Sequence, residues 1–420
     1  GVTFLRTDFF IQFSLPTTTI EAYKNNTNNI QDPKNWNTTF IQQRKEIFKN
    51  AKERDMQTLG IVSYAPSWLT YSGTTQGVPK DWNIYEDLVK KTYKLHRDSI
   101  DYVEIWNEPT HTFFLDIKNS PYTREEAYSL IFKHGAHAIT QVDEEINDGK
   151  KVQIGAQISH NPSDMTILKA FLTDTEIYNY IDFISYHNYV SSEPSNNEII
   201  RIIQKSPLKD KPLILSEWNY DSKENVDNPY KTGNEAITFT ANKLIDFNKM
   251  SLLGANYYSL FPIDESSQTL GHGYLAFYKE ISNKPQLLPQ AKTWRLLSKS
   301  LELGNGKNYI VKATERDDIN SLGFINSNGV LGGTFVNNTD SSGLIEFFFK
   351  NTSIKKRAKI NIYIASPHED GGKVVDSRTV YPENGVLNFR YLIAQNAVLG
   401  IKIYEEDHWY DILDPILRIN

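Results

Sequence analysis

The sequence contains no cysteine, no excess of positive charge and no long apolar run, and each absence excludes a class of protein. Because none of the 420 residues is cysteine, disulfide bonds, cysteine-ligated zinc and thiol catalysis are excluded. Lysine and arginine number 45 against 51 acidic residues, a net charge of −6, so no basic excess is available to neutralise nucleic-acid phosphates. No segment reaches the roughly 18 consecutive apolar residues of a membrane-spanning helix, so we expect no membrane span.

The composition is that of a globular protein with many aromatic side chains. Apolar residues make up 39% of the chain and charged residues 23%, as in ordinary folded domains. Aromatic residues make up 12%. Part of this aromatic content belongs to the core, but rings of the same kind serve as flat stacking surfaces in carbohydrate-binding clefts.

The location of the protein is only weakly indicated. The chain starts without the basic segment and apolar core of a signal peptide. Four Asn-x-Ser/Thr sequences, the acceptor motif for glycans in secreted proteins, occur at Asn25, Asn37, Asn337 and Asn351. We therefore expect a secreted or cell-surface protein, with a cytoplasmic location as the alternative.

Residues 1 to about 300 alternate between strand-like and helix-like segments. Repeated βα units of this kind predict a parallel sheet covered on both faces, and a count near eight predicts a (β/α)₈ barrel. The strand candidates are residues 2–10, 58–66, 102–109, 152–159, 181–189, 212–220 and 254–262. These are seven strands rather than eight. Either a first βα unit is missing upstream of Gly1, or another segment takes its place.

The helical pattern stops after about Leu303, and short strands separated by Asn, Gly, Asp and Pro turns follow. We expect a β-sandwich of roughly 110 residues there. Its strand candidates are residues 310–318, 322–329, 330–340, 343–352, 358–367, 373–385 and 397–407. The predicted organisation is therefore a catalytic barrel over residues 1–302 and an accessory β-sandwich over residues 303–420.

Two glutamates end apolar strands of the predicted barrel. Glu108 follows the run YVEIWN, and Glu217 follows PLILS. The active sites of such barrels lie at the C-terminal ends of the strands, and a buried carboxylate is costly unless it is paired or hydrogen-bonded. Two carboxylates facing one barrel mouth suit glycoside hydrolysis, in which one protonates the leaving oxygen and the other attacks the anomeric carbon. The alternative for each glutamate is a structural role, capping the next helix or pairing with a lysine.

The residues around these glutamates carry a resemblance to a known group of enzymes. The motifs WNEP (106–109), HNY (187–189) and SEW (216–218), in this order, resemble clan A, the large clan of retaining (β/α)₈ glycoside hydrolases. Within the clan the chain most resembles glycoside hydrolase family 39, since FLRTDFF (4–10) and YAPSW (64–68) resemble that family's second and third strands. The resemblance covers residues 1 to about 300 and implies that the missing unit is the first βα unit.

The resemblance implies roles for individual residues. Glu108 would be the general acid/base and Glu217 the nucleophile. The resemblance also implies substrate-binding or positioning roles for side chains at the strand ends, namely Asn107 at the sugar 2-hydroxyl, Arg6 and Tyr189 at the nucleophile, and His187 in the sugar subsite. The clan has a tryptophan platform on its last strand, where this chain offers Tyr257 or Tyr258. Trp68 and Trp218 are further candidates for contact with the sugar.

The leading hypothesis is a retaining glycoside hydrolase that cleaves β-glycosidic bonds in an oligo- or polysaccharide by double displacement. It predicts carboxyl groups about 5–5.5 Å apart and requires neither a metal nor a cofactor. The alternatives are a carbohydrate-binding protein on a hydrolase scaffold, and a transglycosylase, whose first half-reaction is the same. The long aromatic loops at residues 71–82 and 110–123 would decide between internal and terminal cleavage.

Overall fold

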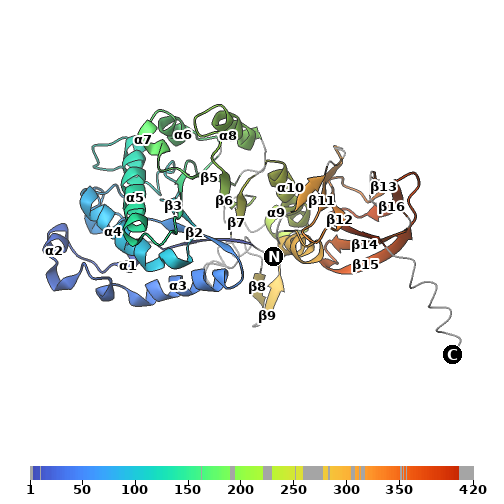
Figure 1. The fold of residues 1–420 in the computed structure, drawn as a ribbon, viewed down its shortest axis with the longest axis horizontal. Helices are drawn as coiled ribbons and strands as arrows, with labels where there is room; N and C mark the ends of the chain where they lie inside the picture. The colour runs from blue at the N-terminus through green and yellow to red at the C-terminus, as the bar shows by residue number, and fades with distance from the viewer. Residues whose placement is uncertain are drawn as a thin grey trace. The chain divides into compact units, whose positions relative to one another are not determined.

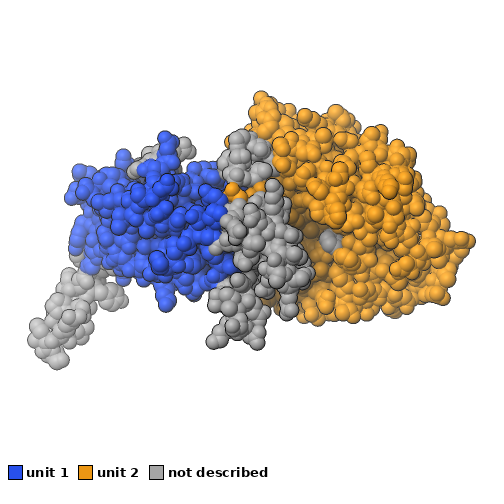
Figure 2. All heavy atoms as spheres, turned by 180° about the vertical axis from the view of Figure 1, so that it is seen from behind, with its two compact units in different colours: residues 1–2, 222–250, 259–420 blue, residues 3–221, 251–258 orange. Residues whose placement is uncertain are grey.

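A computed structural model describes most of the chain and divides it into two compact units (Figure 2). The described residues are 3–9, 11–161, 163–189, 194–220, 229–250, 252–258, 278–281, 284–303, 308–311, 313, 317–350, 352, 354–355 and 357–405. One unit comprises residues 3–221 and 251–258, and the other comprises residues 1–2, 222–250 and 259–420. This division places residues 222–250 with the C-terminal unit, whereas the boundary at residue 302 stays a prediction about the chain's organisation.

The first unit contains a sheet of seven parallel strands that follow one another in chain order, as the sequence predicted (Figure 1). The strands are β1 (Phe4–Asp8), β2 (Gln57–Val62), β3 (Tyr102–Ile105), β4 (Gln153–Gln157), β5 (Phe183–Asn188), β6 (Leu213–Trp218) and β7 (Gly254–Tyr257). Gly254 of β7 lies beside the ring of Phe4 in β1, so the two ends of the sheet approach each other. The sheet is therefore a nearly closed barrel, and the predicted barrel class is confirmed.

Helices connect the strands and cover the outside of the barrel (Figure 1). They are α1 (Ile11–Ser14), α2 (Ile20–Lys24), α3 (Thr38–Lys52), α4 (Trp82–His96), α5 (Arg124–Ile146), α6 (Thr166–Phe171), α7 (Thr175–Tyr178) and α8 (Pro194–Gln204). Capping residues explain where two of these helices begin. Asp81 caps α4 by accepting a hydrogen bond from the Ile84 N–H, and Thr123 and Glu126 form a reciprocal capping box at α5.

The barrel interior is filled by side chains that alternate along the strands. Phe4, Tyr102 and Phe183 pack against one another, with ring centroids 5.4 Å and 5.7 Å apart for the two neighbouring pairs. Gly155 leaves room for the Phe183 ring, since a Cβ atom there would lie 2.0 Å from the ring. This apolar layer closes the barrel beneath the ends of the strands and supports the polar side chains above it.

The second unit is a β-sandwich. A six-stranded sheet contains β10 (Tyr309–Val311), β11 (Ile319–Ile325), β12 (Leu331–Asn337), β17 (Val398–Glu405), β14 (Ala358–Ala365) and β15 (Asp370–Val380), in that spatial order. A ribbon of β13 (Gly343–Phe349) and β16 (Leu387–Ile393) packs on one face, burying Phe347 and Phe389 against Ile360 and Ile401. The sandwich prediction is confirmed, but β16 was missing from the predicted strands.

The other face of the six-stranded sheet is covered by helices of the same unit. These elements are α10 (Glu235–Lys249), α12 (Pro289–Arg295) and a π-helical turn (Leu296–Ser300). The unit also contains α9 (Pro229–Thr232) and a small hairpin of β8 (Tyr278–Ile281) and β9 (Lys284–Leu287). Ile237 and Ile245 of α10 are buried with Phe324 and Val336 of the sheet. Across the part of the chain that the structure describes, no helix is both long and apolar enough to span a membrane.

A buried histidine should make stability depend on pH. His96 is 3% exposed, packs against the rings of Phe9 and Phe48, and has no hydrogen-bond partner for either ring nitrogen among the described residues. Burial, with the charges of Lys45 and Arg44, lowers the pKa of His96 to about 3. On acidification the unfolded chain binds a proton near pH 6.5 and the folded chain does not, so His96 weakens the fold as pH falls from 7 to 5, by about 2 kcal/mol.

We expect His96→Phe to reduce this loss of stability, because phenylalanine takes up no proton in either state. The measurement is urea unfolding at pH 7 and pH 5, and the difference between the two free energies should shrink by about 2 kcal/mol. His137→Phe is the matched control, since the His137 side chain is 43% exposed. If the unfolding free energy of His96→Phe falls between pH 7 and pH 5 by as much as that of the natural protein, His96 takes up its proton in the folded protein as well.

Candidate active site

A polar layer lies above the apolar floor of the barrel, two residues further along the same strands. Side chains two apart in a strand share a face, so Arg6 follows Phe4, Glu104 follows Tyr102, and Ser185 follows Phe183 on the inward side. The Arg6 Nε–H donates to Glu104 at 2.7 Å, and the Ser185 hydroxyl donates to the other oxygen of Glu104. The fully buried Glu104 carboxylate is thus satisfied within the barrel.

Glu217 reaches the barrel mouth because β6 departs from regular pairing. Tyr186 of β5 pairs with Leu215, whereas the next residue, His187, pairs with Glu217, so Ser216 is an extra residue in β6. An irregularity of this type shifts the alternation of side chains after it. Ile214 points into the barrel core, and strict alternation from it would place Glu217 on the opposite face.

Glu108 is positioned by unusual backbone conformations after β3. Trp106 and Glu108 have φ angles of 69° and 47°, in the left-handed region that residues with a side chain seldom adopt. The Trp106 ring is fully buried, and its indole N–H donates to the Phe114 carbonyl at 2.8 Å. Such conformations cost about 1–3 kcal/mol each and persist where the surroundings enforce them, which occurs mostly at functional sites.

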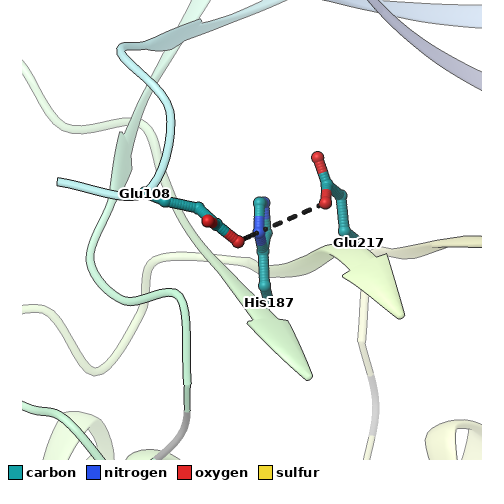
Figure 3. A group of neighbouring side chains, drawn as sticks. All are labelled: Glu108, His187 and Glu217. Atoms are coloured by element: carbon teal, nitrogen blue, oxygen red, sulfur yellow. Dashed lines mark hydrogen bonds and ion pairs between the residues drawn. The ribbon is translucent and has the colours of Figure 1, made fainter. Parts of the chain in front are cut away.

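His187 lies between the two glutamates (Figure 3). Its Nδ1 atom is 2.7 Å from Glu108 Oε1 and 3.4 Å from Glu217 Oε2. One ligand atom from each of the three side chains lies within 4.8 Å of the others, so the two carboxylates face the same small space. The structure therefore brings together Glu108, His187 and Glu217, which come from three different strand ends of the sequence.

The surroundings of Glu217 favour its ionised form. Arg6 Nη1 donates to Oε1 at 2.5 Å, and the Tyr189 hydroxyl donates to Oε2 at 2.6 Å. Burial by itself would raise the pKa of Glu217, but the neighbouring His187 and Arg6 and the two donated hydrogen bonds lower it below the ordinary glutamate value. Glu217 is thus held as a carboxylate with a fixed orientation.

Arg6 connects three acceptors with its guanidinium group. Besides Glu104 and Glu217, it donates through Nη2 to Asn107 Oδ1 at 3.0 Å. Burial opposes the charge of Arg6, but the Glu104 and Glu217 carboxylates raise its pKa. The amide of Asn107 is oriented by this bond, and its Nδ2 atom has a longer contact of 3.4 Å with the Tyr64 hydroxyl.

Glu104 and Ser185 were not predicted as site residues, although a signal for Glu104 was present in the sequence. Glu104 is an ionisable residue inside the apolar run YVEIW, and it is in phase with Tyr102 on the inward face. A charge at such a position requires a buried partner, and Arg6 is the only lysine or arginine in the seven predicted barrel strands. Ser185 carries no comparable signal, because serine is common in strands without any special role.

The predicted aromatic contacts fall into three groups. Tyr258 belongs to the site, since its ring lies 6.2 Å from that of Tyr189, and burial with the charge of Glu217 raises its pKa to about 12. Tyr257 packs edge-to-face on Trp218 at 4.9 Å, and Trp218 is only 1% exposed.

Trp68 stacks on Tyr23 at 5.6 Å instead of contacting any of the site residues above. Contacts of Tyr257, Trp218 and Trp68 with a sugar stay predictions.

The Glu108–His187–Glu217 cluster is also the one group among the described residues with the spacing of metal ligands. Two properties of this cluster oppose the binding of a metal cation. Both oxygens of Glu217 already accept hydrogen bonds from Arg6 and Tyr189, and the Arg6 guanidinium adds a positive charge beside the space. These contacts fit a carboxylate that reacts with a neutral substrate better than one that binds a metal ion.

Comparison of the sequence with protein-family models and with curated proteins finds no match. Comparison of the fold with solved structures does find many similar chains. The feature that this chain shares with those structures is therefore the three-dimensional fold.

Three similar structures are glycoside hydrolases. A family 30 subfamily 8 xylanase from Clostridium acetobutylicum aligns over 96% of this chain and 89% of its own, with a TM-score of 0.64 and 13% identity. A family 39 enzyme from Xanthomonas axonopodis pv. citri aligns over 88% and 83%, with a TM-score of 0.62 and 13% identity. A monomeric β-xylosidase from Caulobacter crescentus CB15 aligns over 89% and 85%, with a TM-score of 0.62 and 13% identity. The chain has the fold of clan A glycoside hydrolases.

Proposed function

We propose that the protein is a retaining glycoside hydrolase that cleaves β-glycosidic bonds in an oligo- or polysaccharide. The observation that carries the proposal is the close approach of the Glu108 and Glu217 carboxylates, whose ligand oxygens lie within 4.8 Å of each other. Retaining enzymes have carboxyl groups about 5–5.5 Å apart, whereas inverting enzymes need about 6.5–9.5 Å to admit a water molecule. The observed approach supports retention.

In the first step, the ionised Glu217 carboxylate attacks the anomeric carbon. A carbon–oxygen bond forms to Glu217 as the bond to the glycosidic oxygen breaks, and Glu108 gives its proton to that oxygen. Arg6 and Tyr189 keep Glu217 ionised and oriented for the attack. Positive charge develops on the sugar ring in this step, and the negative charge of the Glu217 carboxylate stabilises it.

In the second step, water takes the place of the leaving group. Glu108, now a carboxylate, removes a proton from the water as it attacks the anomeric carbon, and the bond to Glu217 breaks. The two inversions together retain the configuration of the sugar. Asn107 is placed by Arg6 next to Glu217, where its amide can bind the 2-hydroxyl, and His187 lines the space between the carboxylates.

A carbohydrate-binding protein on a hydrolase scaffold is the main alternative. It would require one of the two glutamates to be engaged in a structural contact away from the other. Both contact the same His187 nitrogen atom, so the described geometry favours catalysis. A secreted or cell-surface location, the absence of a cofactor and the absence of a nucleic-acid partner stay predictions.

The test is hydrolysis of a panel of aryl β-glycosides and β-linked polysaccharides, with xylosides included because two of the similar structures are a xylanase and a β-xylosidase. We expect cleavage of one class of glycoside. Analysis of products at high acceptor concentration separates transfer to a sugar from transfer to water. Binding of glycans without cleavage of any member of the panel would contradict the proposal and favour the binding protein.

A further inference from the structure

An aromatic cluster follows Glu108 directly in the chain and has no part in the chemistry described above. It consists of His111, Phe113 and Phe114. Phe113 is 65% exposed, the largest value among the large apolar side chains that the structure describes. A single exposed phenylalanine is common on protein surfaces, but Phe113 is distinguished by the rigid backbone that holds it and by its position beside Glu108.

The backbone that carries Phe113 is held by many hydrogen bonds. The Arg124 guanidinium donates to the carbonyls of Pro109, His111 and Leu115, at 3.4, 3.3 and 2.5 Å. The Phe113 N–H donates to His111 Nδ1 at 3.1 Å. A loop tied in this way presents its side chains in one place, which a binding surface requires.

The loop is also joined to the second long loop at the barrel mouth. Asp116 pairs with Gly77 in an isolated parallel bridge, and the Asp116 N–H donates to the Gln76 carbonyl at 3.0 Å. The Thr74 hydroxyl donates to the Asp116 carboxylate at 3.3 Å. Loops 71–82 and 110–123 therefore form one wall rather than two independent segments.

A chain of contacts connects Phe113 to the reacting groups. Its ring meets that of Phe114 edge-to-face at 5.0 Å, and Phe114 stacks nearly parallel to Tyr64 at 6.4 Å and 15°. The Tyr64 hydroxyl contacts Asn107, and the His111 N–H donates to the backbone carbonyl of Glu108 at 2.9 Å. The cluster is thus on the Glu108 side of the carboxylate pair, whereas Arg6 and Tyr189 contact Glu217.

We propose that Phe113, supported by Phe114 and His111, is the stacking surface for the ring of the leaving group. This inference rests on the proposed function, because the group that protonates the glycosidic oxygen necessarily lies beside the leaving group. The apolar face of a sugar ring, or an aromatic aglycone, packs well on an exposed phenylalanine. The substrate class is therefore a glycoside whose leaving group is itself a ring, such as the next sugar of an oligosaccharide.

The test compares two substrates that share the glycosyl group identified by the panel. One is a disaccharide, whose leaving group is a sugar ring, and the other is the glycosyl fluoride, which has no ring to stack. We expect Phe113→Ala to lower kcat/KM for the disaccharide about five- to tenfold, and to change that for the fluoride by less than about twofold. Phe113→Tyr keeps the ring and should retain the activity of the natural protein on both substrates.

Phe348→Ala is the matched control, since Phe348 lies in β13 of the β-sandwich and is 54% exposed. This substitution should leave kcat/KM unchanged for both substrates. Melting temperatures identify any variant that fails to fold. Equal losses on the two substrates, or no loss on either, would overturn the inference. If Glu217→Gln still abolishes activity in that case, the proposed function stands and only the inference about Phe113 falls. If the natural protein cleaves neither substrate, both proposals fall.

Discussion

Glu217→Gln should lower kcat/KM by at least about 10⁴-fold on every glycoside that the natural protein cleaves. The amide has nearly the shape of the carboxylate but cannot attack the anomeric carbon. Arg6 keeps its partner Glu104 in the variant, so we expect the fold to survive. The measurement is initial-rate kinetics on the substrate identified by the panel, with melting temperature as the check on folding.

Glu198→Gln is the control for this change. Glu198 lies in α8 and forms an exposed ion pair with Arg201, with 46% of its side chain accessible. Surface ion pairs of this type contribute about 0–1 kcal/mol, so neither activity nor stability should change appreciably. A folded Glu217→Gln protein with more than a tenth of the natural activity would exclude Glu217 as the nucleophile.

Glu108→Ala should produce a loss that depends on the leaving group. General acid catalysis contributes about 10²–10⁴-fold, so substrates with a poorly departing alcohol should lose that much in kcat/KM. A dinitrophenolate departs without a proton, so kcat/KM for a dinitrophenyl glycoside should fall much less. The second step still lacks its base, and azide, which needs none, should restore kcat on the dinitrophenyl glycoside and yield a glycosyl azide of retained configuration.

The corresponding control is Glu198→Ala, which should show neither the dependence on leaving group nor the response to azide. Glu108→Ala would argue against the assigned role if it lost the same factor on every leaving group and did not respond to azide. In that case Glu108 would position substrate or other side chains, and the proton donor would have to be sought elsewhere around His187.

The sequence predicted the architecture well because its signals are regular. Seven apolar runs separated by helical segments identified the seven strands of the barrel, and turn residues identified most strands of the sandwich. The strand β16 was missed although its segment LNFRYLI carries a strand signal, since the polar Asn388 and Arg390 alternate with apolar residues. The inward residues Leu387 and Phe389 belong to the buried core.

The site was predicted from the positions of residues at strand ends, and its geometry required the fold. Side chains that alternated strictly along β6 from the inward-facing Ile214 would place Glu217 on the outside of the barrel. The extra residue in β6 shifts this alternation and turns Glu217 inward. Nor does the sequence reveal the left-handed conformation of Glu108, since positive φ angles are expected of glycine or asparagine. Both deviations result from tertiary packing, which a local pattern does not encode.

The choice between the neighbours Tyr257 and Tyr258 also depended on three-dimensional packing. At the end of β7, Tyr258 contacts Tyr189 beside Glu217, whereas Tyr257 packs on Trp218. A sequence pattern of two adjacent tyrosines predicts both equally well. Tyr258 is therefore our candidate for the platform that a tryptophan provides in the family that the chain resembles.

The most direct measurement is the identification of the residue that carries a trapped sugar. The protein is incubated with a 2-deoxy-2-fluoro glycoside of the sugar identified by the panel, with dinitrophenolate as leaving group, and digested at acidic pH for peptide mass spectrometry. We predict one added glycosyl group per chain, as an ester on the peptide that contains Glu217. A sugar on a different carboxylate, or steady turnover through an inverted product without any adduct, would contradict the double-displacement mechanism.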